Sequence, residues 1–340
     1  MVRPLVFALV LAVSATGAWA DRWSDCNQIA DPDRQIRACT QIIERGEKET
    51  RKNRAIAYSN RGMAYKKKGE VDRAIADHSK AIALNPNDAI AYSNRGVAHA
   101  EKGDFDRAIA DHSKAIALDP NDAIAYSNRG VAYEKKGEYD RAIADHSKAI
   151  ALDPNDAIAH SNRGVAHAEK GDFDRAIADY DKAIKLNPDY ASAYYNRGNA
   201  YGRKGDFDRA ITDYTKVIAL NPKYARAYSN RGNAYHRKGK VDRAIADYDK
   251  AIALDPNDAT AYYNRGHAYG RKGKVDRAIA DYDKAIALNP NDARAYTIRG
   301  LSYYVKDEVD RAIADFRKAL EINPSDQDAK EGLKRLGVTP

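Results

Sequence analysis

The dipeptide Arg-Gly recurs at eight positions spaced 34 residues apart, from Arg61-Gly62 to Arg299-Gly300. No insertion or deletion interrupts this spacing. A fixed period of this length is typical of stacked structural repeats, in which each unit packs mainly on its neighbours. The period therefore takes precedence over the two or three globular domains that 340 residues alone would suggest.

Each unit predicts a pair of helices joined by tight turns. In the first unit, residues 55–65 are rich in alanine and contain no proline, and Gly69 then suits the left-handed residue that ends a helix. Residues 71–84 carry an apolar stripe at helical spacing. Residues 85–88, Asn-Pro-Asn-Asp, stop that second helix and supply a cap for the next one.

One unit also carries the motif Tyr58-x2-Arg61-Gly62-x2-Tyr65, then Ala74-x3-His78, then Pro86. This motif resembles the tetratricopeptide repeat (TPR), in the Asn-Arg-Gly variant of exported bacterial proteins, and the resemblance covers all eight units. It implies an all-α fold: an α-solenoid wound as a right-handed superhelix, with a concave groove lined mainly by the first helix of each pair. The units are expected at 55–88, 89–122, 123–156, 157–190, 191–224, 225–258, 259–292 and 293–326.

The arginine of the repeated dipeptide departs from the family, which usually carries leucine there. Asp72 and Asp77 recur in every unit, and a half-buried arginine needs such a partner, so we interpret Arg61 as part of a structural ion pair. The small Gly62 allows the two helices of a unit to approach closely.

The N-terminal 20 residues predict a secretory signal peptide, with Arg3, an apolar run and an Ala-x-Ala ending at Ala20. The alternative is an uncleaved membrane anchor, but the apolar run is shorter than the roughly 20 residues that span a bilayer. No later segment predicts a membrane span. We therefore expect a periplasmic or secreted protein.

Residues 21–54 predict a degenerate N-terminal cap repeat, with a charged linker at 46–53. An even number of cysteines in an exported chain favours a disulfide. Aligned on the first repeat, Cys39 takes the slot of His78 and Cys26 that of Tyr65, and the resemblance implies that these slots face each other. It thus implies a Cys26–Cys39 disulfide, with free thiols or an intermolecular bond as alternatives.

At the other end, residues 327–340 predict a capping helix with the apolar stripe Ala329, Leu333 and Leu336. Charge argues against one class of partner. The chain has 57 basic and 49 acidic residues, and removal of the signal peptide takes away one arginine, which leaves +7. These charges are mixed along helices, so we expect no nucleic-acid partner.

No catalytic motif is present: the sequence has no phosphate-binding glycine loop, no G-x-S-x-G and no H-E-x-x-H. We therefore expect no enzyme activity, no cofactor and no metal site. Most histidines occupy slots that other units fill with tyrosine, which indicates packing; they are His78, His99, His112, His146, His160 and His167. Buried neutral rings would make the fold less stable in acid.

The residue before each Arg-Gly is the strongest candidate for binding. It is asparagine in seven units, at Asn60, Asn94, Asn128, Asn162, Asn196, Asn230 and Asn264, and is replaced by Ile298 in the eighth. The resemblance implies that this slot faces the groove, where an amide can both donate to and accept from a peptide backbone. The alternative is inheritance through duplication of the units.

Other groove slots change character along the chain. Units one to four carry isoleucine or valine-like residues, at Ile56, Ile90, Ile124, Ile158, Met63, Val97, Val131 and Val165. Units five to eight carry basic, polar and aromatic residues there, including Tyr195, Arg203, Arg226, Arg237, Tyr263 and Arg271. Such a groove suits a partner with an apolar stretch followed by acidic residues or a terminal carboxylate.

The sequence thus predicts a non-enzymatic protein-interaction scaffold that binds an extended peptide or partner protein, in assembly or adaptor work in a bacterial envelope. A self-associating structural scaffold without a peptide ligand is the first alternative. An enzyme or enzyme subunit is a remote one, since no set of residues supports it.

Overall fold

The computed structural model describes residues 21–28 and 30–339, and the predicted signal peptide lies outside them. The described residues form helices and turns and no strand. None of the helices in these residues is long and apolar enough to cross a membrane. The fold is an α-solenoid, as the sequence predicts.

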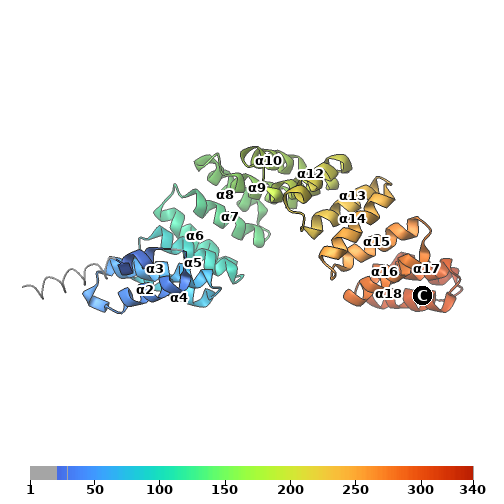
Figure 1. The fold of residues 1–340 in the computed structure, drawn as a ribbon, viewed down its shortest axis with the longest axis horizontal. Coiled ribbons are helices and arrows are strands. Elements are labelled where there is room, and N and C mark those ends of the chain that lie inside the picture. The colour runs from blue at the N-terminus through green and yellow to red at the C-terminus, as the bar shows by residue number, and fades with distance from the viewer. Residues whose placement is uncertain (1–20, 29, 340) are drawn as a thin grey trace, which may run out of the picture. The chain divides into compact units, whose positions relative to one another are not determined.

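The chain divides into two compact units, one ending at Lys170 and the other beginning at Gly171. In the first unit, a helix over 21–27 precedes the cap elements and the repeats (Figure 1). These are α2 (Pro32–Ile43), the 3₁₀ turn η1 (Gly46–Lys48), α3 (Arg51–Lys67), α4 (Val71–Leu84), α5 (Ala89–Glu101), α6 (Phe105–Leu118), α7 (Ala123–Lys135), α8 (Tyr139–Leu152) and α9 (Ala157–Glu169). From α2 to α9, each helix packs on the next.

The second unit repeats this arrangement. It contains α10 (Phe173–Leu186), α11 (Ala191–Arg203), α12 (Phe207–Leu220), α13 (Ala225–Arg237), α14 (Val241–Leu254), α15 (Ala259–Arg271), α16 (Val275–Leu288), α17 (Ala293–Val305), α18 (Val309–Ile322) and α19 (Gln327–Arg335). Successive helices again pack in chain order.

Local sequence explains where the helices begin and end. Asp122 caps α7, because its carboxylate accepts from the backbone N–H groups of Ile124 and Ala125 at 2.9 and 3.0 Å. After α5, Gly103 adopts a φ of +79°, which few other residues tolerate. α3 begins at Arg51, inside the expected linker, because Thr50 accepts from the N–H of Asn53 at 3.0 Å and caps this helix early.

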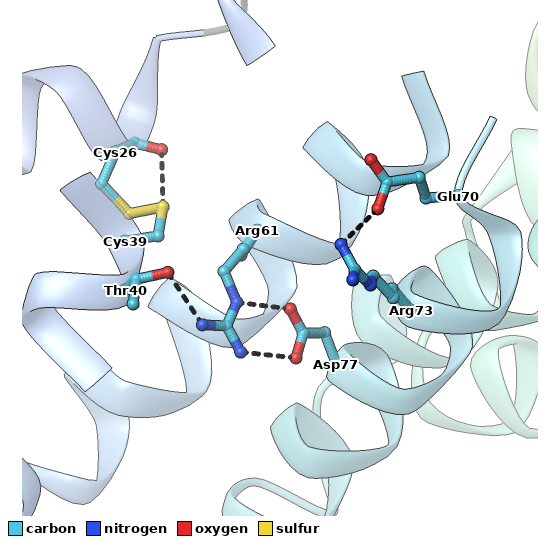
Figure 2. A network of polar contacts seen from close by, with 7 residues as sticks. All are labelled: Cys26, Cys39, Thr40, Arg61, Glu70, Arg73 and Asp77. Carbon is cyan, nitrogen blue, oxygen red and sulfur yellow. Dashed lines mark hydrogen bonds and ion pairs between the residues drawn. A yellow bond between two sulfur atoms is a disulfide. The ribbon is translucent and has the colours of Figure 1, made fainter. Parts of the chain in front are cut away.

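The repeated arginine joins three helices. Arg61 on α3 donates from Nε and Nη2 to the two carboxylate oxygens of Asp77 on α4, at 2.7 and 2.9 Å (Figure 2). Its Nη1 donates to Thr40 on α2 at 2.9 Å. The arginine therefore connects the two helices of its own repeat and the last helix of the preceding element.

The same connection recurs along both units. The bidentate pairs join Arg95 to Asp111, Arg129 to Asp145, Arg197 to Asp213, Arg231 to Asp247, Arg265 to Asp281 and Arg299 to Asp315. The third bond reaches Ser79, Ser113, Asp181, Thr215, Asp249 and Asp283 in the preceding repeat. Arginine is thus structural, as the sequence suggests.

The second expected partner of the arginine was wrong. Asp72 lies in the first turn of α4, 83% exposed, and pairs with Lys102 of the next repeat at 2.5 Å. Asp77 lies one and a half turns further along α4, on the buried side of that helix, where it reaches Arg61.

The glycine after each arginine lies against an aromatic ring of the second helix. A Cβ atom on Gly62 would come within 2.8 Å of the ring of His78. The same conflict holds for Gly96 with His112, Gly130 with His146, Gly198 with Tyr214, Gly232 with Tyr248, Gly266 with Tyr282 and Gly300 with Phe316. Glycine is required because the ring fills the space that a side chain would occupy.

A degenerate repeat packs on the first repeat, and a capping helix packs on the last repeat that the structure describes. A disulfide joins Cys26 to Cys39, and both are fully buried beside Ile42 and Ala57. At the other end, α19 buries Ala329 and Leu333 against the cluster that contains Phe316. These contacts cover the outer apolar faces of the first and last repeats that the structure describes.

Two glycines of α15 test the packing of the aromatic slot, the position on the second helix whose ring lies against the glycine after the repeated arginine. Gly266→Ala places a methyl group 2.8 Å from the ring of Tyr282, and we expect a loss of about 2 kcal/mol from overpacking. Gly270→Ala meets nothing within 4 Å and should stabilise the helix by up to about 0.5 kcal/mol. Thermal unfolding midpoints of the two variants would measure the difference, and equal midpoints would contradict this packing account.

Candidate functional site

The first helices of the repeats carry the side chains that differ most between units. Near the start of these helices, Ile90, Ile124 and Ile158 in the first unit are 67%, 69% and 57% exposed. The equivalent residues of the second unit are also exposed, and they are Ser192, Arg226, Thr260 and Arg294. The first unit therefore exposes a row of three isoleucines in consecutive repeats, where the second unit has polar or basic residues.

The seven asparagines that precede Arg-Gly are all half-buried, but their environments differ. Asn60 donates to Asn27 of the cap at 2.9 Å. Asn230 donates to the hydroxyl of Tyr195 and to Asn199, both at 3.0 Å. The amide nitrogen of Asn94 is buried without a hydrogen-bond partner. The asparagine row is therefore partly engaged within the protein, and its use by a ligand stays a prediction.

One depression lies over the first unit, on α5, α6 and α7, with a volume of about 260 Å³. We call it the apolar depression. Its lining comprises Val97, Ala100, Glu101, Phe105, His112, Asn128, Val131, Ala132 and Lys135. It places Asn128 from the asparagine row beside two of the predicted valines.

A second depression lies over the second unit, on α13 and α15, with a volume of about 610 Å³. We call it the basic depression. It is lined by Asn233, His236, Arg237, Tyr263, Asn264, His267 and Arg271. Four of the predicted site residues therefore lie together here: Arg237, Tyr263, Asn264 and Arg271.

The other predicted residues of the second unit lie elsewhere. The ring of Tyr195 packs edge-on against Tyr224 at 5.2 Å and near Tyr214 at 6.0 Å, and burial raises the pKa of its hydroxyl. Arg203 and Arg226 are exposed on α11 and α13 and do not line the basic depression.

Sequence reasoning missed His236. Its slot holds lysine, alanine, glutamate, glycine or tyrosine in the other repeats, so it carried no periodic signal. The signal that could have found it is local: His236 follows Asn233 by three residues, which places both on one face of α13.

The histidines of the aromatic slot serve packing. The rings of His78 and His112 are almost fully buried against Gly62 and Gly96. Burial, the main cause, lowers the pKa of each ring to about 4. The described residues contain no group of three or more histidine, cysteine or carboxylate side chains that could hold a metal ion.

Comparison of the sequence with models of known protein families identifies several matches. The model described as "TPR repeat" matches residues 62–103, 99–137, 166–205, 198–239 and 232–273. Models described as "Tetratricopeptide repeat" match 123–156, 147–178 and 263–327. A comparison with curated proteins finds no match.

Solved structures resemble the chain in fold. A chain of the APC/C hetero-tetramer Cut9-Hcn1 aligns with a TM-score of 0.59 and 21% identity, over 89% of this chain and 59% of that one. A tetratricopeptide repeat protein from Parabacteroides merdae gives 0.57 and 25%, over 72% and 97%. Pseudomonas aeruginosa pilF gives 0.57 and 20%, over 63% and 97%.

The buried histidines predict acid sensitivity. Their folded pKa lies below the ordinary value near 6.5, so their neutral form is fully stabilising above that value. The stabilisation is lost as pH falls from about 6.5 toward 4, by about 2 kcal/mol per ring at pH 5. We expect the melting temperature to fall over this window and to fall less in the variant His78→Phe/His112→Phe, because Phe316 shows that phenylalanine fits the slot. An equal fall in both proteins would count against these rings as the cause.

Proposed function

Since this chain belongs to the TPR repeat family, we propose that it is a non-enzymatic scaffold that binds an extended segment of a partner protein along the first helices of its repeats. The observation that carries the proposal is the separation of two sets of slots. The slots that repeat without change make the packing contacts of the scaffold. Slots that change between repeats form the exposed isoleucine row and, together with Asn128 or Asn264 of the asparagine row, line the two depressions.

The apolar depression supports a peptide ligand most directly. Val97 and Val131 supply apolar area. The side chain of Asn128 can donate to and accept from a backbone amide of the ligand, whatever side chain the ligand carries there. Glu101 and Lys135 at the same depression add one charge of each sign. This combination fits an extended segment with an apolar side chain.

The exposed row of Ile90, Ile124 and Ile158 also favours a second candidate, a scaffold that associates with copies of itself. Light scattering over a concentration series separates the two. A monomer at all concentrations would leave the peptide proposal, and growth of mass with concentration would support self-association.

Binding of peptides selected from a random phage-displayed library tests the main proposal. Asn128→Ala together with Val131→Asp should weaken selected peptides by about tenfold or more, since one lost hydrogen-bonded contact is worth about 1.4 kcal/mol. The matched control Asn121→Ala removes the same amide from an exposed turn and should bind as the parent does. Far-ultraviolet circular dichroism checks that both variants keep their helices. Selection of no peptide, or equal binding by both variants, would refute the proposal.

We also propose export from the cytoplasm to an envelope compartment, with an assembly or adaptor role there. The predicted signal sequence and the buried Cys26–Cys39 disulfide support this, because such bonds persist in oxidising compartments. When the full chain is expressed in a bacterial host, N-terminal sequencing of the envelope fraction should begin at Asp21. Recovery only from the cytoplasm, with Met1 retained, would exclude export.

A further inference from the structure

The basic depression presents hydrogen-bond donors and positive charge, and its two arginines have no carboxylate partner among the residues that the structure describes. Arg271 donates to the backbone carbonyl of His236 at 3.4 Å, and Arg237 lies 5.7 Å from the ring centre of Phe207. By contrast, Arg231 and Arg265 on the same two helices are each tied to an aspartate. Arg237 and Arg271 are therefore available to an external anion.

Asn233 adds an amide donor to the basic depression, held in one orientation. The hydroxyl of Tyr248 on α14 donates to the amide oxygen of Asn233 at 2.7 Å. That bond uses the amide oxygen of Asn233. The NH₂ group of the same side chain can then donate to a ligand in the depression. A carboxylate accepts from both guanidinium and amide donors, and its negative charge favours it over a neutral carbonyl beside two arginines.

Two histidines meet in the same depression. Nδ1 of His267 lies 3.4 Å from Nε2 of His236, and the rings are nearly perpendicular, with centres 5.0 Å apart. When one added proton makes one ring an imidazolium, that ring can donate to the neutral ring in contact with it. Protonation of both rings would bring two cations into contact. The pair therefore takes up one proton at a time.

We propose that the basic depression binds an acidic peptide segment and takes up one proton with it, on the His236–His267 pair. The inference rests on the proposed function, because it names the ligand chemistry of one part of the peptide-binding surface. A carboxylate of the peptide lies between Arg237 and Arg271 and faces the shared proton.

The surroundings of the pair set the direction of the effect. Burial, the ring of His267, Arg271 and Arg237 all lower the pKa of His236, and burial and Arg271 lower that of His267. On the neighbouring elements, Tyr248 of α14 donates to Asn233 of the depression, and Arg294 of α17 lies 5.6 Å from the ring centre of Tyr263 and binds Asp292 at 2.9 Å.

Without a ligand, the pair is therefore neutral at neutral pH. A bound carboxylate adds a negative charge beside the pair and raises its pKa, so binding is accompanied by proton uptake. Affinity for the acidic segment rises as pH falls through the pKa of the occupied pair. A rise of one pKa unit corresponds to a tenfold change in affinity.

Fluorescence anisotropy with a labelled hexa-aspartate peptide tests this on the chain from Asp21 onward. Aspartate remains ionised at about pH 5.5, so a change in affinity between about pH 7.5 and 5.5 reports on the protein. We expect binding about tenfold tighter at the lower pH and no binding of a hexa-asparagine peptide. Circular dichroism at both values confirms that the chain is folded.

Three double variants separate the contributions. His236→Gln/His267→Gln should bind the peptide with an affinity that no longer changes with pH. Arg237→Gln/Arg271→Gln should lose at least tenfold at both values. Lys250→Gln/Lys284→Gln removes the same charge from exposed positions on α14 and α16 and should bind as the parent does.

Three results would overturn the inference. Equal affinity at both pH values, or pH dependence that survives loss of both histidines, excludes the shared proton. Equal losses of affinity in the arginine and lysine variants show that the peptide is attracted by the net charge of the protein, and exclude a specific site at the basic depression. Each leaves the proposed function standing, because that proposal is tested by peptides selected from a random library and by variants of the apolar depression.

Discussion

The bidentate pair between the repeated arginine and the aspartate of the second helix is the interaction on which the rest of the structure depends. In the first repeat the side chains of Arg61 and Asp77 are 16% and 8% exposed, and the tyrosines Tyr58 and Tyr65 lie beside the guanidinium at 5.5 and 5.7 Å. The hydrogen bond to Asp77 is the main reason that the pKa of Arg61 is raised. A charge held in this way is stable because three of its N–H groups donate to protein oxygens, and the third bond, to Thr40, connects the arginine to the preceding element.

A scaffold held by fixed slots leaves other slots free to vary. The ring that packs on the glycine is histidine, tyrosine or phenylalanine in different repeats, and the neighbouring slot on the first helix also varies. Tyr214 and Tyr248 donate to Asn199 and Asn233, whereas Phe316 shares its repeat with Leu301. The same slot supplies Val97 and Val131 to the apolar depression, and Asn233 and His267 to the basic depression. Two depressions of different chemistry thus arise on one backbone design.

The period and its resemblance predicted the α-solenoid, the helix pairs and the structural role of arginine, because these follow from contacts that repeat in every unit. Asp77, rather than Asp72, could be chosen as its partner only once the face of α4 was known. The sequence also predicted Arg237, Tyr263 and Arg271 as groove residues, and the structure brings these three together at one depression. It could not tell them from Arg203 and Arg226, or find His236, because those differences depend on side-chain direction and on contacts between adjacent repeats.

The central claim, that the repeated arginine holds the scaffold while the variable slots bind, is tested most directly by a double-mutant cycle on Arg129 and Asp145. Each single variant, Arg129→Leu and Asp145→Leu, leaves a half-buried charge without its partner and should lower stability by about 2–3 kcal/mol. The double variant should lose less than the sum of the two, with a coupling of about 1 kcal/mol or more. Affinity for the hexa-aspartate peptide should stay unchanged. Additive losses, or lost peptide binding with stability intact, would contradict the account.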